Sequence, residues 1–229
     1  LQPQAFTLTS ELPGRTTAYR IAEVRPQVNG IILKRLFKEG GDVKEGQQLY
    51  QIDPAVYDAT LKSAQANLAQ TKSIADRYKQ LVDEQAVSRQ EYDTAVSNRM
   101  TSEANLQTAQ INVRYTKVFA PISGRIGSSA FTEGALVSNR QADAMAVIQQ
   151  LDPIHADLTP STRELNDLRR SFRAGHLKQV GQDQAKATPI QDDGSLHPSP
   201  GKLLVAENSV DPGTRPLIPR TEFPNPEPP

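Results

Sequence analysis

From Ala55 to Thr116, more than a quarter of the chain, the sequence contains neither Gly nor Pro. Ala, Gln, Leu, Lys, Asp and Ser dominate this stretch, a composition that favours long helices over strands or loops. Asp53 is expected as the N-cap and Pro54 as the first helical residue, because a missing N–H is tolerated there. The segment therefore predicts a long helical region.

Within this region small and apolar residues recur at alternating steps of three and four, which is the repeat of a coiled coil. The first run comprises Leu61, Ala64, Leu68, Thr71, Ala75, Tyr78 and Val82. The second run comprises Tyr92, Ala95, Arg99, Ser102, Leu106, Ala109, Val113 and Thr116, and its rhythm is weaker at Arg99 and Ser102. We call these positions the seam, because they are predicted to face the other helix.

A helix start divides the two runs. Ser88 followed by Glu91 has the spacing of a capping box, and Val87 with Tyr92 has that of a hydrophobic staple. We expect a break of two or three residues before Ser88, and a short break makes neighbouring helices antiparallel. The prediction is a hairpin with about 30 residues per arm, roughly 45 Å long at 1.5 Å per residue.

The segments on either side of the hairpin resemble each other. Each contains a Pro, then a Gly (Gly30 or Gly124), then a β-rich stretch that ends in Glu-Gly at Gly40 or Gly134. Short apolar runs bounded by Gly indicate strands and turns. The two halves are therefore predicted to form one small β-sandwich, with the hairpin inserted between them and these four glycines at its turns.

Further strands are expected at Ala5 to Leu12 and at Ala144 to Leu158, outside the sandwich. Ser161 to Ala174 is predicted to form a short helix, since its apolar residues share one face and a Gly follows. Hydrophobic residues make up 37% of the chain and aromatic residues 5%, which argues against one thick core. A second β domain built from both ends of the chain fits this composition.

Composition also excludes several functions. The 26 basic and 26 acidic residues balance, so the charge gives no reason to expect a nucleic-acid partner. The chain has no Cys and therefore no disulfide or thiolate site, and no run of about 18 apolar residues that would span a bilayer. The three histidines, His155, His176 and His197, lack ligand spacing, so we expect no metal site. No nucleophile or phosphate-binding motif is present, and no catalytic residue is predicted.

Two segments carry a resemblance to a known family. The stretches Ile21 to Arg35 and Tyr115 to Gly127 closely resemble the periplasmic adaptor (membrane fusion) proteins of resistance-nodulation-division multidrug efflux pumps, of the AcrA and MexA type. The resemblance implies a split lipoyl-like β-sandwich with an inserted antiparallel coiled-coil α-hairpin, and a β-barrel domain containing one short helix. We expect the β-barrel at 1–21 and 139–229, the lipoyl-like domain at 22–53 and 117–138, and the hairpin at 54–116.

The resemblance further implies a periplasmic adaptor that links a proton-driven inner-membrane transporter to an outer-membrane channel and seals the conduit between them. Self-association as a trimer or hexamer is implied, as is anchoring to the inner membrane of a Gram-negative bacterium. The lipidated N-terminal Cys and the membrane-proximal domain of the family have no counterpart in this sequence. We therefore expect both ends of the adaptor to be missing from the chain.

In this family an Arg-Leu-Ser pattern at the hairpin tip meets the outer-membrane channel, and Arg77, Leu81 and Ser88 match it. Each residue also has a simpler explanation: Ser88 as a helix cap, Arg77 as a solvated charge, and Leu81 as an ordinary exposed apolar residue. Leu81 lies one position away from the seam at Val82, so we expect it to face outward. The docking role rests on the family pattern.

Two alternatives remain at this point. An adaptor of an ABC exporter or a type I secretion system shares the architecture. A lipoyl or biotinyl carrier domain would need a Lys at the turn between the two halves, but the turn here is Ile52-Asp53-Pro54. We therefore expect no covalent cofactor.

Overall fold

The computed structural model describes residues 11–174, 179–181, 184–190, 194–204 and 220–226. The chain divides into two compact units, one formed by Ala22–Ile148 and the other by Leu1–Ile21 with Gln149–Pro229. Strands β1 (Gly14–Val24) and β8 (Ala146–Leu158) each contribute to both units.

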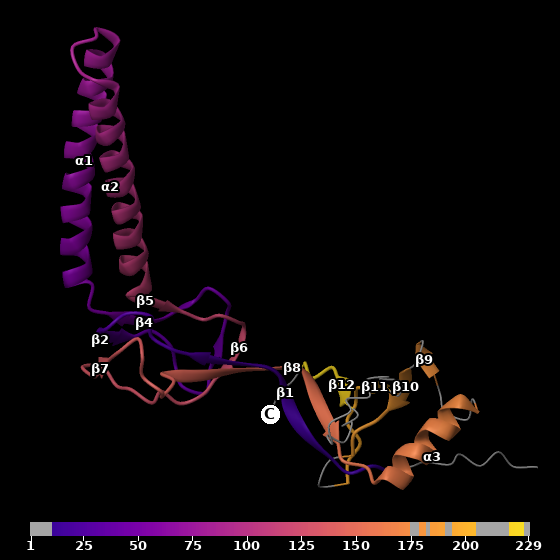
Figure 1. The fold of residues 1–229 in the computed structure, drawn as a ribbon. Coiled ribbons are helices and arrows are strands. Elements are labelled where there is room, and N and C mark those ends of the chain that lie inside the picture. The colour runs from indigo at the N-terminus through magenta and orange to yellow at the C-terminus, as the bar shows by residue number, and fades with distance from the viewer. Residues whose placement is uncertain (1–10, 175–178, 182–183, 191–193, 205–219, 227–229) are drawn as a thin grey trace, which may run out of the picture. The chain divides into compact units, whose positions relative to one another are not determined.

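The hairpin belongs to the first unit. It consists of α1 (Ala55–Asp83) and α2 (Arg89–Tyr115), which run antiparallel beside each other (Figure 1). Every predicted seam position is buried or half-buried, so the repeat is confirmed. Five of these positions are buried, and four of the five carry small side chains: Ala75, Ala95, Ser102 and Ala109, with Thr116 at the base of the hairpin as the fifth. These small residues let the two backbones approach closely along the seam.

Both ends of α1 differ slightly from the prediction. The N-cap is Pro54 rather than Asp53. Asp53 precedes the cap by one residue, and its carboxylate accepts a hydrogen bond from Ala55 N–H at 3.0 Å. At the other end four residues, 84–87, precede the cap of α2, where two or three were predicted. The break is longer because three of its residues, Glu84, Gln85 and Ala86, donate their backbone N–H groups to carbonyls of the last turn of α1.

The sandwich is built from the segments on either side of the hairpin. Before it lie β2 (Gly30–Arg35), β3 (Asp42–Val43) and β4 (Gln48–Ile52). After it lie β5 (Lys117–Phe119), β6 (Gly124–Ile126) and β7 (Leu136–Val137). One sheet has the order β5-β4-β2-β7, and β3 pairs with β6. The predicted insertion of the hairpin into a β-sandwich is confirmed.

The two halves exchange strands reciprocally. β2, from the first half, pairs antiparallel with β7 from the second, with Gly30 opposite Val137. β6, from the second half, pairs antiparallel with β3 from the first, with Gly124 opposite Val43. The repeat seen in the sequence therefore corresponds to an internal two-fold relation, in which each half completes the sheet of the other.

The two Glu-Gly turns repeat the same hydrogen bonds. Gly40 N–H donates to the Ile126 carbonyl at 2.9 Å, and Gly134 N–H donates to the Ile32 carbonyl at 2.8 Å. Both glycines are left-handed, with φ of 70° and 85°, a conformation that side chains rarely adopt. Each Glu-Gly turn is therefore hydrogen-bonded to the opposite half of the sandwich.

The contacts of the two glutamate side chains explain why a Glu precedes the Gly in both halves. Glu39 accepts a hydrogen bond from Ser129 N–H at 3.0 Å, and Glu133 accepts one from Arg35 N–H at 2.9 Å. The bond from Ser129 N–H is the main reason why the pKa of Glu39 is lowered, and Arg35 beside it adds to the effect. Both carboxylates thus bind a backbone donor of the opposite half.

The core of the first unit lies between the two halves. Its buried residues are Val24, Val28, Ile32, Val43, Leu49, Tyr50, Ile52, Val118, Ala120, Ile126, Val137, Met145, Ala146 and Ile148. Met145 and Ile148 fall in the range assigned to the β-barrel from sequence, which began at residue 139. They are fully buried here instead, because β8 begins inside the sandwich before it continues into the second unit.

Gly30→Ala is predicted to lower the free energy of unfolding by about 1–3 kcal/mol, the usual range for overpacking a core. A Cβ at residue 30 would lie 2.6 Å from Cγ2 of Ile52, which is fully buried and has little room to move. Gly127→Ala is the control, since its nearest new contact is the Val147 carbonyl oxygen at 3.5 Å. Urea unfolding of the two variants should differ accordingly, and equal stabilities would contradict this packing.

The second unit combines strands with one helix. β9 (Gln179–Gly181), β10 (Gln184–Ala187), β11 (Gly201–Leu204) and β12 (Arg220–Phe223) form an antiparallel ladder that continues to β8. α3 (Thr162–Arg173) confirms the predicted short helix to within one residue at each end. Most of the strand predicted at Ala5 to Leu12 lies outside the described residues.

Candidate functional site

α1 ends at the hairpin tip in a Schellman motif. Gln85 N–H donates to the Val82 carbonyl at 3.1 Å, and Ala86 N–H donates to the Leu81 carbonyl at 2.8 Å. These bonds satisfy carbonyls that the end of a helix leaves open. Gln85 occupies the left-handed position of the motif with φ of 59°, where Gly is the usual residue. For a residue with a Cβ this conformation costs roughly 1–2 kcal/mol.

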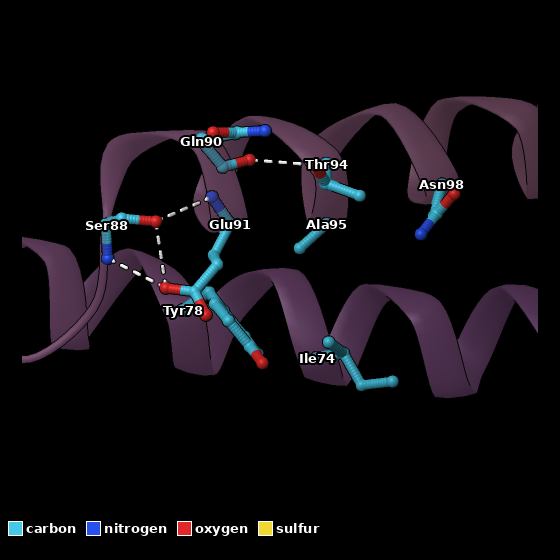
Figure 2. A pocket seen from close by; sticks show the side chains of 8 residues that line it. All are labelled: Ile74, Tyr78, Ser88, Gln90, Glu91, Thr94, Ala95 and Asn98. Carbon is cyan, nitrogen blue, oxygen red and sulfur yellow. Dashed lines mark hydrogen bonds between the residues drawn. The ribbon is translucent and has the colours of Figure 1, made fainter.

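α2 begins with the predicted capping box, which is confirmed. The Ser88 hydroxyl accepts a hydrogen bond from Glu91 N–H at 3.2 Å, and Ser88 N–H donates to a carboxylate oxygen of Glu91 at 2.9 Å (Figure 2). The Ser88 hydroxyl also donates to that carboxylate oxygen, at 2.9 Å. Its only proton is therefore engaged, and the hydroxyl retains acceptor capacity alone for any further contact.

The capping box predicts an acid-sensitive contribution to stability. Hydrogen bonds from Ser88 N–H and then from the Ser88 hydroxyl hold the pKa of Glu91 below its ordinary value of 4.5. A carboxyl whose pKa is lowered by folding stabilises the folded state above its ordinary pKa. That stabilisation is lost as the pH falls through the lowered value.

Glu91→Gln should therefore weaken the acid dependence of the thermal midpoint of helix loss. The measurement is helical circular dichroism of the full chain between about pH 6 and pH 3, the window in which carboxyls titrate. Glu103→Gln is the control, because Glu103 is exposed on the same helix and forms no hydrogen bond or ion pair with the described residues. If both variants kept the acid dependence of the parent chain, the capping carboxylate would not be its source.

Arg77 and Leu81 lie one helical turn apart on the same flank of α1. The Arg77 side chain is exposed and has no ion pair or hydrogen bond within the described part of the chain. Leu81 was predicted to face outward, but it is half-buried. It follows Ile74 by seven residues, and the two share the edge of the seam, where the facing helix covers part of each side chain. The apolar area that Leu81 offers a partner is smaller than predicted.

A shallow groove opens beside these residues, between the two helices near the tip. Its volume is about 540 Å³, and Figure 2 shows its two walls. We call it the tip groove; it is lined by Ile74, Tyr78, Ser88, Gln90, Glu91, Thr94, Ala95 and Asn98. Of these, only Ser88 belongs to the pattern predicted as a site. All of the others except Gln90 could have been found from the heptad repeat, because each is a seam residue or directly precedes one: Ile74, Tyr78, Glu91, Thr94, Ala95 and Asn98.

A second groove along the same two helices carries no charged side chain. It is lined by Thr60, Ser63, Ala64, Asn67, Asn105, Thr108, Ala109 and Asn112. Among the residues that line the two grooves, Glu91 near the tip is the only charged one. The tip combines Arg77, which is unpaired within the described residues, with a partly covered Leu81 and the hydrogen-bonding groups of the groove. This arrangement suits the binding of another macromolecule.

The predicted turn glycines lie elsewhere, in the sandwich. Gly30, Gly40, Gly124 and Gly134 shape the scaffold and take no part in the tip. No cluster of three or more potential metal-ligating side chains occurs among the described residues, and His176 lies outside them. Within the same residues, no helix combines the length and the apolar character that crossing a bilayer requires.

Comparisons with known proteins give consistent results. The model of a family described as the barrel-sandwich hybrid domain of RND membrane fusion proteins matches residues 20–149. The antibiotic efflux pump periplasmic linker protein ArpA of Pseudomonas putida is 65% identical over 227 residues, which cover 99% of this chain and 61% of ArpA. The multidrug resistance protein MexA of Pseudomonas aeruginosa is 59% identical over 226 residues, covering 99% of this chain and 59% of MexA.

A solved structure is also similar. A MacA-MexA chimera that contains the α-hairpin domain of Pseudomonas aeruginosa MexA has a TM-score of 0.68 and 29% identity. The match covers 92% of this chain and 76% of the chimera. The chain spans about three fifths of the length of the curated relatives that it matches.

Proposed function

Since the chain belongs to the family of RND membrane fusion proteins, we propose that it is the periplasmic adaptor of a drug efflux pump. In this proposal it links a proton-driven inner-membrane transporter to an outer-membrane channel, assembles around the conduit between them, and catalyses nothing. The observation that carries the proposal is the 65% identity to a periplasmic linker of an antibiotic efflux pump, which extends over 99% of the chain.

The hairpin tip is the proposed contact with the channel. The exposed guanidinium of Arg77 offers a planar set of donors for carbonyls or carboxylates of the partner. Leu81 adds the apolar area that its half-buried position leaves open, and Ser88 adds an acceptor. The capping box and the Schellman motif support this role, because they fix the backbone that carries the three side chains.

The sandwich is the proposed contact between copies of the chain, in a trimer or hexamer. Ile31 on β2 lies directly opposite Leu136 on β7, and both are exposed, as is Leu33 two residues further along β2. Together they form an apolar patch on the outer side of a sheet whose other side is the core. Exposed apolar patches of this kind are typical of association surfaces.

The remaining parts of the proposal rest on the family. The second unit, with α3 and the ladder from β8 to β12, is proposed as the β-barrel that meets the transporter. The periplasm of a Gram-negative bacterium is the proposed location, as the names of the relatives indicate for them. Attachment to the inner membrane through a lipid anchor is likewise proposed for the full-length protein.

Two alternatives are not favoured. An adaptor for an ABC exporter or a type I secretion system shares the fold, but the matching family model and relatives belong to RND and drug efflux pumps. A lipoyl or biotinyl carrier is disfavoured because the turn that would hold the modified Lys leads through Asp53 and Pro54 directly into α1.

Co-purification tests the proposed function. The tagged full chain, recovered from the membranes of its own cell after mild crosslinking, is expected to bring down an RND transporter and an outer-membrane channel, identified by mass spectrometry. Recovery of an ABC transporter in place of the RND transporter would support the first alternative. Recovery of neither transporter nor channel would contradict the adaptor function.

A further inference from the structure

The inference concerns Gln85, at the apex of the hairpin. With φ of 59°, Gln85 is the only residue other than Gly that takes a positive φ in the described part of the chain. The other left-handed positions in that part are all glycines: Gly40, Gly46, Gly134 and Gly194. At those turns the chain has the residue that adopts this backbone without strain, and at the apex it does not.

The backbone hydrogen bonds of the Schellman motif hold Gln85 in this conformation, but no contact of its side chain within the described chain compensates for the strain of the Cβ. The Gln85 side chain is exposed, and its amide forms no hydrogen bond with the described residues. The backbone bonds of the Schellman motif are made by main-chain N–H groups, which Gly would supply equally well. A strained residue that its own surroundings do not require is a sign of a role in function rather than in folding.

The position of Gln85 places it within the proposed docking surface. It lies between Leu81 and Ser88 in sequence, and the next residue, Ala86, is hydrogen-bonded to the Leu81 carbonyl. The motif therefore fixes the Gln85 backbone relative to Leu81, and the left-handed conformation sets the direction of its side chain.

The geometry points to Gln85 as a further docking residue, whose amide binds exposed peptide groups of the outer-membrane channel. This inference rests on the proposed adaptor function. A primary amide donates and accepts at once and carries no charge, so it matches a turn or helix end that presents an unpaired N–H beside an unpaired C=O. The Gln85 amide could therefore bind both donors and acceptors of the partner backbone, whereas the Arg77 guanidinium can bind acceptors only.

Three variants of the full chain distinguish the contribution of the Gln85 amide from that of the Gln85 backbone conformation and test the docking surface. Gln85→Gly removes both the amide and the strain, Gln85→Ala removes the amide and keeps the strain, and Arg77→Asp tests the docking surface itself. Binding is measured against purified outer-membrane channel from a Pseudomonas RND pump, held in detergent micelles. Stability is measured as the thermal midpoint of helix loss.

Gln85→Gly is expected to raise the midpoint by about 2–4 °C, the shift that relief of such strain gives in a chain of this size. The same variant, and Gln85→Ala with it, should bind the channel about tenfold more weakly, as the loss of an interfacial hydrogen-bonding group does. Normal binding by both variants would overturn the inference. Weak binding by Gln85→Gly alone would also overturn it, since that result assigns the loss to a loosened backbone.

Arg77→Asp distinguishes failure of the inference from failure of the proposed function. If Arg77→Asp abolishes binding while both Gln85 variants bind normally, the docking surface stands and Gln85 has no part in it. If the parent chain does not bind the channel, or Arg77→Asp binds as well as the parent, the docking surface is wrong and the inference fails with it.

Discussion

Arg77→Asp is expected to abolish drug efflux while leaving the fold of the chain intact. The side chain is exposed and unpaired within the described residues, so reversing its charge removes nothing that holds the hairpin together. At an interface, loss of a charge-assisted contact typically costs about 2–5 kcal/mol, which corresponds to at least about a 30-fold weaker complex. Drug susceptibility should rise to that of cells without the chain, at unchanged abundance and unchanged thermal midpoint.

Lys79→Asp is the matched control for this variant. Lys79 is also an exposed cation near the end of α1, but helical spacing places it on the flank away from Ile74 and the tip groove. The same charge reversal there should leave drug susceptibility unchanged. If Arg77→Asp and Lys79→Asp pumps worked equally well, or failed equally, Arg77 would have no specific role in docking.

The largest expected loss of stability comes from the seam. Ala75 is only 3% exposed, so Ala75→Asp would place a carboxylate between the two helices without a partner. An uncompensated buried charge costs about 3–5 kcal/mol. Because short helices depend on tertiary packing for their stability, much of the helical circular dichroism should be lost at lower temperature or lower urea concentration.

Ala66→Asp makes the same chemical change on the exposed side of the same helix. Its effect on the urea midpoint should be small, since only the helix propensity and the surface charge change. Equal destabilisation by the two variants would mean that the loss comes from the introduced Asp and not from the seam. The coiled-coil packing would then need revision.

The sequence predicted the hairpin well because its determinants are local. A heptad repeat fixes which side of a helix is buried, and Ser88 with Glu91 defines a helix start by chemistry within four residues. The sandwich was predictable for another reason. Its halves repeat the same Gly and Glu-Gly positions, and each repeat forms the corresponding contact with the other half.

Other features depend on contacts that the sequence does not reveal. Leu81 was predicted to face outward because it lies one position from Val82 in the seam. Its actual burial depends on how closely the two helices approach, since a close approach lets the facing helix cover the edge of the seam. Met145 and Ile148 were placed in the wrong unit because β8 passes through both without a turn residue to mark the boundary. Gln85 gave no signal at all, since its residue type does not indicate a left-handed backbone.

Site-specific photocrosslinking in living cells tests the central proposal, that the hairpin tip of the chain meets an outer-membrane channel. A photoreactive residue is introduced into the full chain at Glu84, exposed at the tip, and separately at Lys62, exposed towards the base of α1. The account predicts a covalent adduct between position 84 and an outer-membrane channel protein, and no such adduct from position 62. The proposal would be contradicted if the chain were abundant and folded in these cells but formed no channel adduct from position 84, or formed the adduct equally from both positions.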